Sequence, residues 1–296
     1  MRKIVILIFN LMTFFSFSQT QVSADAYKNE IEQWHQNRVK SLKSETGWLN
    51  IAGLFWLKEG ENTFGSSKEN NIILPIGKAD EKLGIFILKE GIVSFTTAAN
   101  SNAESNNTPF AAGVIFDEKQ ETPIILSHKN LRWFIIKRGS KYGVRMRDFE
   151  SDALKNFTHI ERFPVDEKWK ITAVYEAPEK DKTIPINDVI GLTTETPFGG
   201  TLRFEIDGTT FQLDATLEGN ELFIVFADKT TGNETYGGGR FLYAVKPSEG
   251  NTVILDFNKA YNPPCCFTNF ATCPLPPAQN RLAIQISAGE KTYGHH

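Results

Sequence analysis

The chain contains few of the residues that build metal centres and redox sites, with three cysteines and five histidines among its 296 residues. It also lacks the Cys-x-x-Cys, His-Glu-x-x-His and Gly-x-Ser-x-Gly patterns that mark common zinc sites and hydrolase nucleophiles. A structural zinc site needs four thiolate or imidazole ligands, and the sequence shows no such grouping. We therefore expect neither a bound metal nor a cofactor.

A long apolar run is missing everywhere except at the N-terminus, where Ile4 to Phe15 follows two basic residues. This run is shorter than the roughly 20 residues that a membrane-spanning helix needs. Ser16 and Ser18 stand at the small-residue positions of a cleavage point before Gln19, as in a secretory signal peptide. The sequence thus predicts a signal peptide over residues 1–18, a secreted or periplasmic protein, and no membrane span in the mature chain.

Positive charge is not in excess, because 32 basic residues face 35 acidic ones. Removing the signal peptide removes Arg2 and Lys3 and no acidic residue, which leaves 30 basic residues and a net charge near −5. An acidic chain without basic clusters is a poor match to nucleic acid or to anionic lipid. We expect no nucleic-acid partner.

Short apolar runs separated by turn residues fill the chain from Gly47 onward, which is typical of β-structure. The 23 phenylalanines favour the same class. Asp207-Gly208 is the clearest hairpin signal, because it lies between alternating segments and glycine tolerates the positive φ of a tight turn. Thr196 to Gly200 is interpreted as a turn. Further expected strands include Gly84 to Leu88, Ile92 to Thr96, Trp133 to Lys137, Tyr142 to Met146, Trp169 to Glu176, Glu221 to Ala227, Phe241 to Val245, Thr252 to Phe257 and Leu282 to Ile286.

One helix is expected before these strands. Tyr27, Ile31 and Trp34 recur at spacings of four and three residues, so they share one helical face. Ser23 is the expected N-cap. We expect the shared face to pack across the β-structure.

The expected fold class is mainly β, with an N-terminal helix (residues 19–46), two packed antiparallel β-units of sandwich or barrel type, and few short helices. A charged, turn-rich stretch that begins at Pro178 marks the expected boundary between the units. The N-terminal β-unit would then span residues 47–177 and the C-terminal β-unit residues 178–296.

One segment, Leu255 to Leu282, holds all three cysteines, five of the 13 prolines and four asparagines. We call it the strap. Because proline fixes φ and lacks an N–H donor, the strap cannot be a central strand and must run as turns or stiff loop. Such rigidity suits either a binding site or a structural brace.

Cys265 and Cys273 are the pair expected to form a disulfide, which would close a short loop in an oxidising compartment. Cys266 is then expected to be a buried, apolar-like thiol. A metal site and a catalytic cysteine are the alternatives. The first lacks further ligands nearby in the sequence, and the second lacks a visible base.

A ligand pocket is expected where the strap meets the turn before Phe241. Arg240 is suited to gripping a carboxylate or phosphate, or alternatively to pairing with Asp256 or Glu290. Asparagines commonly cap turns, so a structural role is the alternative for each of them. The expected ligand-binding residues are Tyr236, Arg240, Asp256, Asn258, Tyr261, Asn262, Asn280 and Arg281.

Several blocks together form a recognisable pattern, namely Gly47-Trp-Leu-Asn-Ile-Ala-Gly-Leu-Phe-Trp-Leu57, Asn62-Thr-Phe-Gly-Ser66, Ile73-Leu-Pro75, Arg147-Asp-Phe-Glu-Ser151, Phe163-Pro-Val-Asp166, Tyr236-Gly-Gly-Gly-Arg-Phe-Leu-Tyr243, Asp256 to Leu282 and Ala288-Gly-Glu-Lys291. With them the chain resembles an uncharacterised bacterial family, domain of unknown function 1684. The resemblance extends over nearly all of the mature chain. It implies kinship and carries no known reaction.

The stretch from Phe64 to Pro75 is also similar to the start of a forkhead-associated domain, a β-sandwich that binds phosphothreonine. Those domains follow this glycine with an arginine and carry a later Ser-x-x-His. Here Ser66 follows Gly65, and residues 76–84 contain no histidine. Without an arginine fork a phosphate loses its charge-assisted partner. The similarity implies a sandwich and argues against phosphopeptide binding.

These observations favour a protein that binds a small molecule or a glycan in a pocket under the strap. One alternative is a hydrolase that uses the same pocket, with Asp256 or Glu290 as the general base and Arg240 as the substrate or oxyanion holder. Another is a structural envelope component in which the strap only braces the fold.

Overall fold

The structure of the protein is a computed structural model that describes residues 25–120 and 122–294. The expected signal peptide (1–18) and the expected N-cap Ser23 lie outside the described residues. Within them the chain is mainly β, with packed, mostly antiparallel sheets and few short helices, which confirms the predicted class. No helix of this described part is long and apolar enough to cross a membrane.

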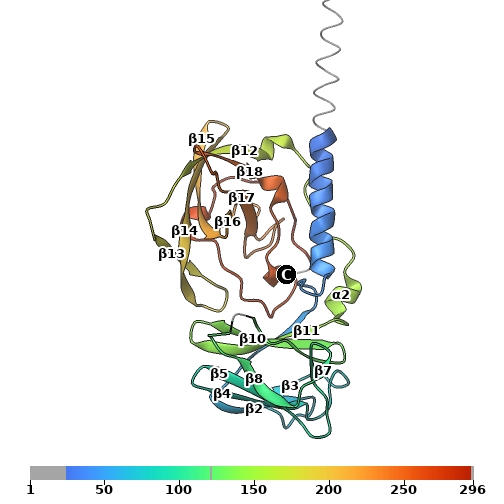
Figure 1. Cartoon of the computed structure of the whole chain (residues 1–296). Coiled ribbons are helices and arrows are strands. Elements are labelled where there is room, and N and C mark those ends of the chain that lie inside the picture. The colour runs from blue at the N-terminus through green and yellow to red at the C-terminus, as the bar shows by residue number, and fades with distance from the viewer. Residues whose placement is uncertain (1–24, 121, 295–296) are drawn as a thin grey trace, which may run out of the picture.

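The N-terminal helix occupies residues 25–43 and runs along the C-terminal β-unit (Figure 1). Tyr27 and Ile31 on its expected face are buried, and Leu42 near its end is 1% exposed. Trp34, on the same face, lies 6.3 Å from the ring of Tyr261 between centroids. The predicted apolar stripe is therefore the side by which the helix packs.

Arg38 attaches this helix to the strap. Its guanidinium lies 4.3 Å from the ring centroid of Trp48 and 4.7 Å from that of Tyr261. It also donates to Glu290 Oε1 at 3.2 Å and to the carbonyl of Asn262 at 3.0 Å. A guanidinium stacked on rings keeps its in-plane donors available, so one side chain makes both kinds of contact.

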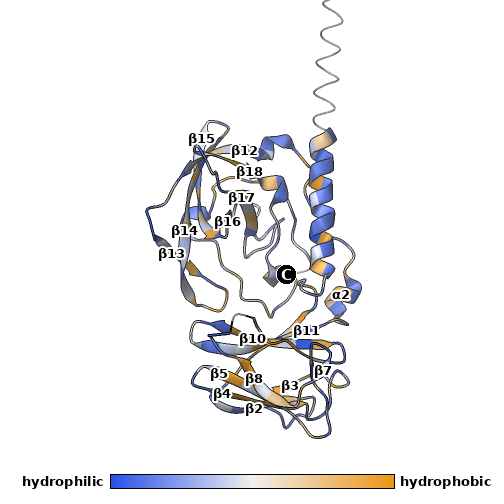
Figure 2. Cartoon of the chain, in the orientation of Figure 1, coloured by the Kyte–Doolittle hydropathy of each residue, from blue (hydrophilic) through white to orange (hydrophobic). Residues whose placement is uncertain are grey.

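The N-terminal β-unit is a sandwich of two facing sheets (Figure 1). One sheet has the order β1-β11-β10-β9-β6-β7, with β1 (Ile51–Trp56), β6 (Glu104–Ser105), β7 (Thr108–Pro109), β9 (Leu126–His128), β10 (Leu131–Arg138) and β11 (Lys141–Asp148). The other has the order β3-β2-β4-β5-β8, with β2 (Gly60–Gly65), β3 (Ile72–Ile73), β4 (Gly84–Lys89), β5 (Ile92–Thr97) and β8 (Ala112–Phe116). Between them Phe64 packs against Trp133 and Phe86, with centroid distances of 5.4 and 5.1 Å. Figure 2 shows apolar residues along these strands.

The C-terminal β-unit is a strongly curved, nearly closed sheet. Its order is β17-β16-β15-β14-β12-β18, and β13 pairs with one end of β14. The strands are β12 (Lys170–Glu176), β13 (Thr183–Asn187), β14 (Thr193–Ile206), β15 (Thr209–Glu218), β16 (Glu221–Phe226), β17 (Arg240–Val245) and β18 (Thr252–Asp256). Its interior is apolar, with Leu202, Leu213, Ile224 and Phe257 all fully buried.

The change from one unit to the next lies earlier than the boundary expected at residue 178. Strand β12 pairs with β14 and β18, so it belongs to the C-terminal sheet. The sheets therefore change between Asp148 and Lys170. The sequence pattern carries no sign of this, because a strand reads the same whichever sheet it joins.

The local hairpin signal at Asp207-Gly208 predicted its element correctly. Asp207-Gly208 joins β14 and β15, and both residues have positive φ, as a tight hairpin turn requires. Ser151 caps α2 (Asp152–Asn156) by accepting from the N–H of Leu154. The remaining short helices of the described chain are η1 (Glu167–Trp169), η2 (Phe257–Lys259), η3 (Pro264–Cys266) and η4 (Ala278–Asn280).

Two local expectations are wrong. The segment Thr196 to Gly200 is not a turn but part of β14, which is irregular between Phe198 and Gly200. The segment Leu282 to Ile286 is not a strand. Its backbone is bonded singly to neighbouring segments, for example from the N–H of Leu282 to the carbonyl of Ala227, rather than through a ladder.

Gly239, just before β17, lies so close to its neighbours that a side chain there should not fit, and a substitution can test this. Its φ is +86°, and a Cβ there would lie 2.5 Å from Cγ of Pro276 and 2.6 Å from the carbonyl oxygen of Phe226. We expect Gly239→Ala to lower the free energy of unfolding by about 1–3 kcal/mol. Gly237→Ala is the matched control, since nothing but the Cα of Gly232, at 3.9 Å, would meet its Cβ. Urea unfolding of both variants checks this; equal losses would contradict it.

Candidate functional site

Arg240 is fully enclosed in the C-terminal unit, where it is 1% exposed. It donates to Asp228 Oδ2 at 3.1 Å, to the carbonyl of Ile286 at 3.1 Å, and to the carbonyl of Ala288. Burial lowers the pKa of Arg240, and the Asp228 carboxylate opposes that change. The ion pair expected with Asp256 or Glu290 is not the one that forms. Arg240 instead anchors the chain that follows the strap.

The three asparagines expected in a ligand site hold the strap to its surroundings. Asn258 donates to the hydroxyl of Tyr27 at 3.0 Å, Asn262 to the carbonyl of Lys291 at 2.6 Å, and Asn280 to the carbonyl of Val225 at 2.9 Å. All three are at most 4% exposed. These bonds give the asparagines structural roles, as the alternative expected, but they reach residues distant in the sequence and do not cap local turns.

The two expected carboxylates are buried in the same network. Asp256 accepts from the hydroxyl of Tyr27 at 2.8 Å. Glu290 accepts from Arg38 and from the backbone N–H of Asn262. Burial raises the pKa of Glu290, although Arg38 opposes the rise. Both side chains thus serve the docking of the helix and strap.

The other expected residues are dispersed. Tyr261 stands at the centre of the Arg38 contact, and burial raises its pKa. Tyr236 packs against the apolar cluster that contains Leu42 and Phe267. Arg281 is exposed. The structure therefore does not gather the eight expected residues around one cavity.

Cys265 and Cys273 form the expected disulfide, with their Cα atoms 6.1 Å apart. Cys266 is buried, as expected, and its sulfur accepts from the N–H of Tyr293 at 3.4 Å. Burial raises the pKa of the Cys266 thiol to about 11.

Across the residues that the structure describes, no group of three or more His, Cys, Asp or Glu side chains is placed to hold a metal ion.

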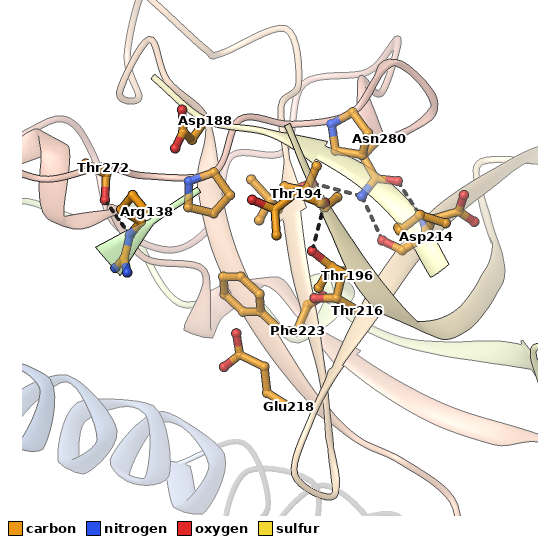
Figure 3. A pocket seen from close by; sticks show the side chains of 15 residues that line it. Arg138, Asp188, Thr194, Thr196, Asp214, Thr216, Glu218, Phe223, Thr272 and Asn280 are labelled. Atoms are coloured by element: carbon orange, nitrogen blue, oxygen red, sulfur yellow. Dashed lines mark hydrogen bonds between the residues drawn. The ribbon is translucent and has the colours of Figure 1, made fainter. Parts of the chain in front are cut away.

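A cavity of about 200 Å³ nevertheless lies under the strap, and we call it the strap pocket (Figure 3). At one end Arg138 of β10 donates to Thr272 of the strap at 3.2 Å, and at the other Asn280 binds the backbone of Asp214. The lining residues are Arg138, Ile184, Ile186, Asp188, Thr194, Thr196, Asp214, Thr216, Glu218, Phe223, Val225, Thr272, Pro274, Pro277 and Asn280.

One wall of the strap pocket comes from the hairpin of β13 and β14. Ile184 faces Thr196 across the two strands, and Ile186 faces Thr194. Because every second residue of a strand points to the same side, these four side chains share one face. The wall therefore alternates aliphatic and hydroxyl groups in a fixed register.

The acidic side chains of the pocket are held in place by local hydrogen bonds. Asp188 accepts from the N–H groups of Ile190 and Leu192 at 3.0 and 2.9 Å. Glu218 accepts from the hydroxyl of Tyr243 at 2.6 Å. A carboxylate has about four lone-pair sites, so each keeps acceptor capacity for hydroxyl donors of a ligand.

Sequence reasoning identified the strap but missed this wall. The available signal was the alternation in Thr183-Ile-Pro-Ile-Asn187, which predicts a one-sided strand. Its partner stretch, Thr193-Thr-Glu-Thr-Pro197, shows no such alternation and overlaps the segment interpreted as a turn, so the pair was not recognised. Asn280 is the one expected ligand residue that lines the strap pocket.

The family model described as "Protein of unknown function (DUF1684)" matches residues 155–291. Among solved structures, an uncharacterised protein of Haloarcula marismortui is 32% identical, with 47% of this chain and 78% of that chain covered and a TM-score of 0.39. No curated protein shows a significant match.

Two forkhead-associated domains are similar at 15% identity and a TM-score of 0.22. One comes from a study of phosphothreonine-dependent interactions of such domains, and the other is the FhaA domain complexed with the intracellular domain of Rv3910. Each match covers 32% of this chain, with 92% and 97% of the respective domains. All three structural TM-scores are below 0.5, so any function must be argued from this chain's own residues.

The buried pair of Arg240 and Asp228 is expected to be essential for stability. Replacing Arg240 by methionine leaves a buried carboxylate without its countercharge, which costs about 3–5 kcal/mol. Arg203→Met is the control, because Arg203 pairs with Glu176 at the surface and its loss costs at most about 1 kcal/mol. Urea unfolding compares the two; similar losses would show that the buried pair is not an anchor.

The buried Cys266 thiol is expected to be unreactive in the folded protein at pH 8. Its pKa of about 11 keeps it protonated, and burial blocks access. Labelling with a thiol-specific reagent should require unfolding and should accelerate in the folded state only as pH approaches 11. Rapid labelling of the folded protein at pH 8 would contradict this assignment.

Proposed function

We propose that this chain, which belongs to the DUF1684 family of proteins of unknown function, is an exported protein that binds a small hydroxylated molecule or a short glycan in the strap pocket. The secretory pattern of residues 1–18 supports export, and so does a disulfide that persists best in an oxidising compartment.

The main support for the proposal is the wall formed by the paired strands β13 and β14, which the strap covers. The wall presents Thr194 and Thr196 beside aliphatic groups, and Pro274 and Pro277 close the opposite side. Prolines cannot rearrange freely, so the cavity exists before a ligand arrives and little conformational entropy is lost on binding.

The chemistry of the lining favours a hydroxylated ligand. The carboxylates of Asp188 and Glu218 accept from hydroxyl donors, while threonine hydroxyls both donate and accept. The ring of Phe223 and the aliphatic side chains offer an apolar surface to a carbon skeleton. Ligand sites of this type combine apolar walls with a few oriented polar groups.

A hydrolase with Asp256 or Glu290 as base is less well supported. Neither residue lines the strap pocket, and both are bonded within the network that docks the helix. Arg240, the expected oxyanion holder, is 1% exposed and bonded to Asp228. A general base must reach the proton it removes, so binding without turnover is the better account.

The test is a thermal-shift screen of the purified protein against monosaccharides, short oligosaccharides and hydroxylated acids. We expect at least one compound to raise Tm, by a stabilisation of about 2.7 kcal/mol at a concentration of 100 Kd. Thr194→Trp should abolish the shift, because a large ring at that position fills the cavity.

Thr193→Trp is the matched control, since Thr193 is the neighbouring residue on the same strand and does not line the pocket. The control should keep the shift, and the compound should be recovered unchanged. A shift that survives Thr194→Trp would refute the strap pocket as the site. Conversion of the compound would support the hydrolase, and no shift from any compound would support a structural brace.

A further inference from the structure

A second cavity, of about 250 Å³, lies between the sandwich and the disulfide loop of the strap. We call it the arginine pocket. It shares Arg138, Thr272 and Pro274 with the strap pocket, so the two cavities adjoin. Its lining residues are Ile51, Phe134, Ile136, Arg138, Arg145, Arg147, Phe241, Pro264, Ala271, Thr272, Cys273 and Pro274.

The charge in this cavity has one sign. Three arginines line it, and no aspartate or glutamate does. Two of the three are engaged, because Arg147 donates to Asn50 and to the carbonyl of Gly47, and Arg138 donates to Thr272. These bonds hold both guanidinium groups in place without neutralising them.

Arg145 differs from the other two. It lies in β11 between Leu54 of β1 and Phe134 of β10, and it is only 7% exposed. Among residues 25–120 and 122–294, its guanidinium forms no hydrogen bond or ion pair. The charged groups that shift its pKa are Arg138 and Arg147, and both lower it.

A buried guanidinium without a counter-ion is costly, so natural proteins pair nearly all of them. Burial and the two neighbouring arginines lower the pKa of Arg145 to about 10, which still leaves the group protonated at neutral pH. Arg145 is thus a charged, prepositioned donor for which the described residues supply no countercharge.

We propose that the arginine pocket binds the carboxylate or phosphate group of a small anion, with Arg145 as its direct partner. A guanidinium matches the two oxygens of such a group through parallel N–H donors. Arg138 and Arg147 add positive charge from both sides. The apolar side chains of Phe134, Ile136 and Phe241 make the surroundings less polar than water, which strengthens each charge-assisted bond.

The proposal stands apart from binding in the strap pocket, because it concerns a different chemical group and because its direct partner, Arg145, does not line the strap pocket. It also differs from phosphate recognition by a forkhead-associated domain, which the sequence excludes at Ser66. The arginines of this pocket instead lie on the sheet surface of β10 and β11 that faces the strap.

The test titrates inorganic phosphate and, in a separate arm, succinate into the purified protein at constant ionic strength set with chloride. Tm and calorimetric heat are followed. We expect saturable binding of at least one anion, and the stronger arm identifies phosphate or carboxylate as the preferred group. Arg145→Met should weaken binding by about tenfold or more. Arg203→Met, which removes an exposed and paired arginine, should leave it unchanged.

A second variant keeps the proposal testable if Arg145→Met does not fold. Phe134 lies directly opposite Arg145, so Phe134→Glu supplies the missing carboxylate from within the chain. This variant should have a higher Tm without added anion and should no longer respond to phosphate or succinate. The proposal is overturned if the wild-type protein shows no saturable binding of either anion, or if Arg145→Met and Phe134→Glu bind as tightly as wild type.

Discussion

The strap is a proline-rich segment that cannot hydrogen-bond as a strand, and the rest of the C-terminal half is arranged around this constraint. Without a ladder of its own, the strap is held by its side chains: Asn262 and Asn280 donate at buried positions to the carbonyls of Lys291 and Val225. Arg240 donates in the same way to carbonyls that follow the strap. The polar residues that first suggest a binding site are therefore the means by which an irregular segment stays folded.

Because the strap is held rigidly, it joins parts of the molecule that are distant in sequence. The helix docks onto it through Arg38, which combines ring stacking with an ion pair to Glu290. The sandwich meets it at the bond between Arg138 and Thr272. Both cavities lie next to that junction, and their walls come from both β-units. Removing the contacts that hold the strap would therefore disrupt both cavities and also lower the stability of the fold.

Two buried arginines differ in whether the fold supplies them with a countercharge. This difference distinguishes an arginine that stabilises the fold from one proposed to bind a ligand. Arg240 has a carboxylate and two carbonyls around it, so its charge is compensated within the fold. Arg145 is almost as deeply buried, and within the described chain the charged groups that shift its pKa are both arginines. The sequence drew attention to Arg240 because it stands at the turn expected to meet the strap, whereas Arg145 sits inconspicuously in a strand. Burial and pairing, which distinguish the two, are properties of packing alone.

The sequence by itself determined what depends on near neighbours. Turn chemistry specified the hairpin at Asp207-Gly208, helical spacing specified the buried face of the helix, and eight residues of separation allowed the pair of Cys265 and Cys273. Only the tertiary structure decided which sheet β12 joins, which side chains line each cavity, and which arginine lacks a partner. Those outcomes depend on contacts between residues far apart in the chain, such as Arg138 with Thr272, and periodicity along a sequence carries no information about such contacts.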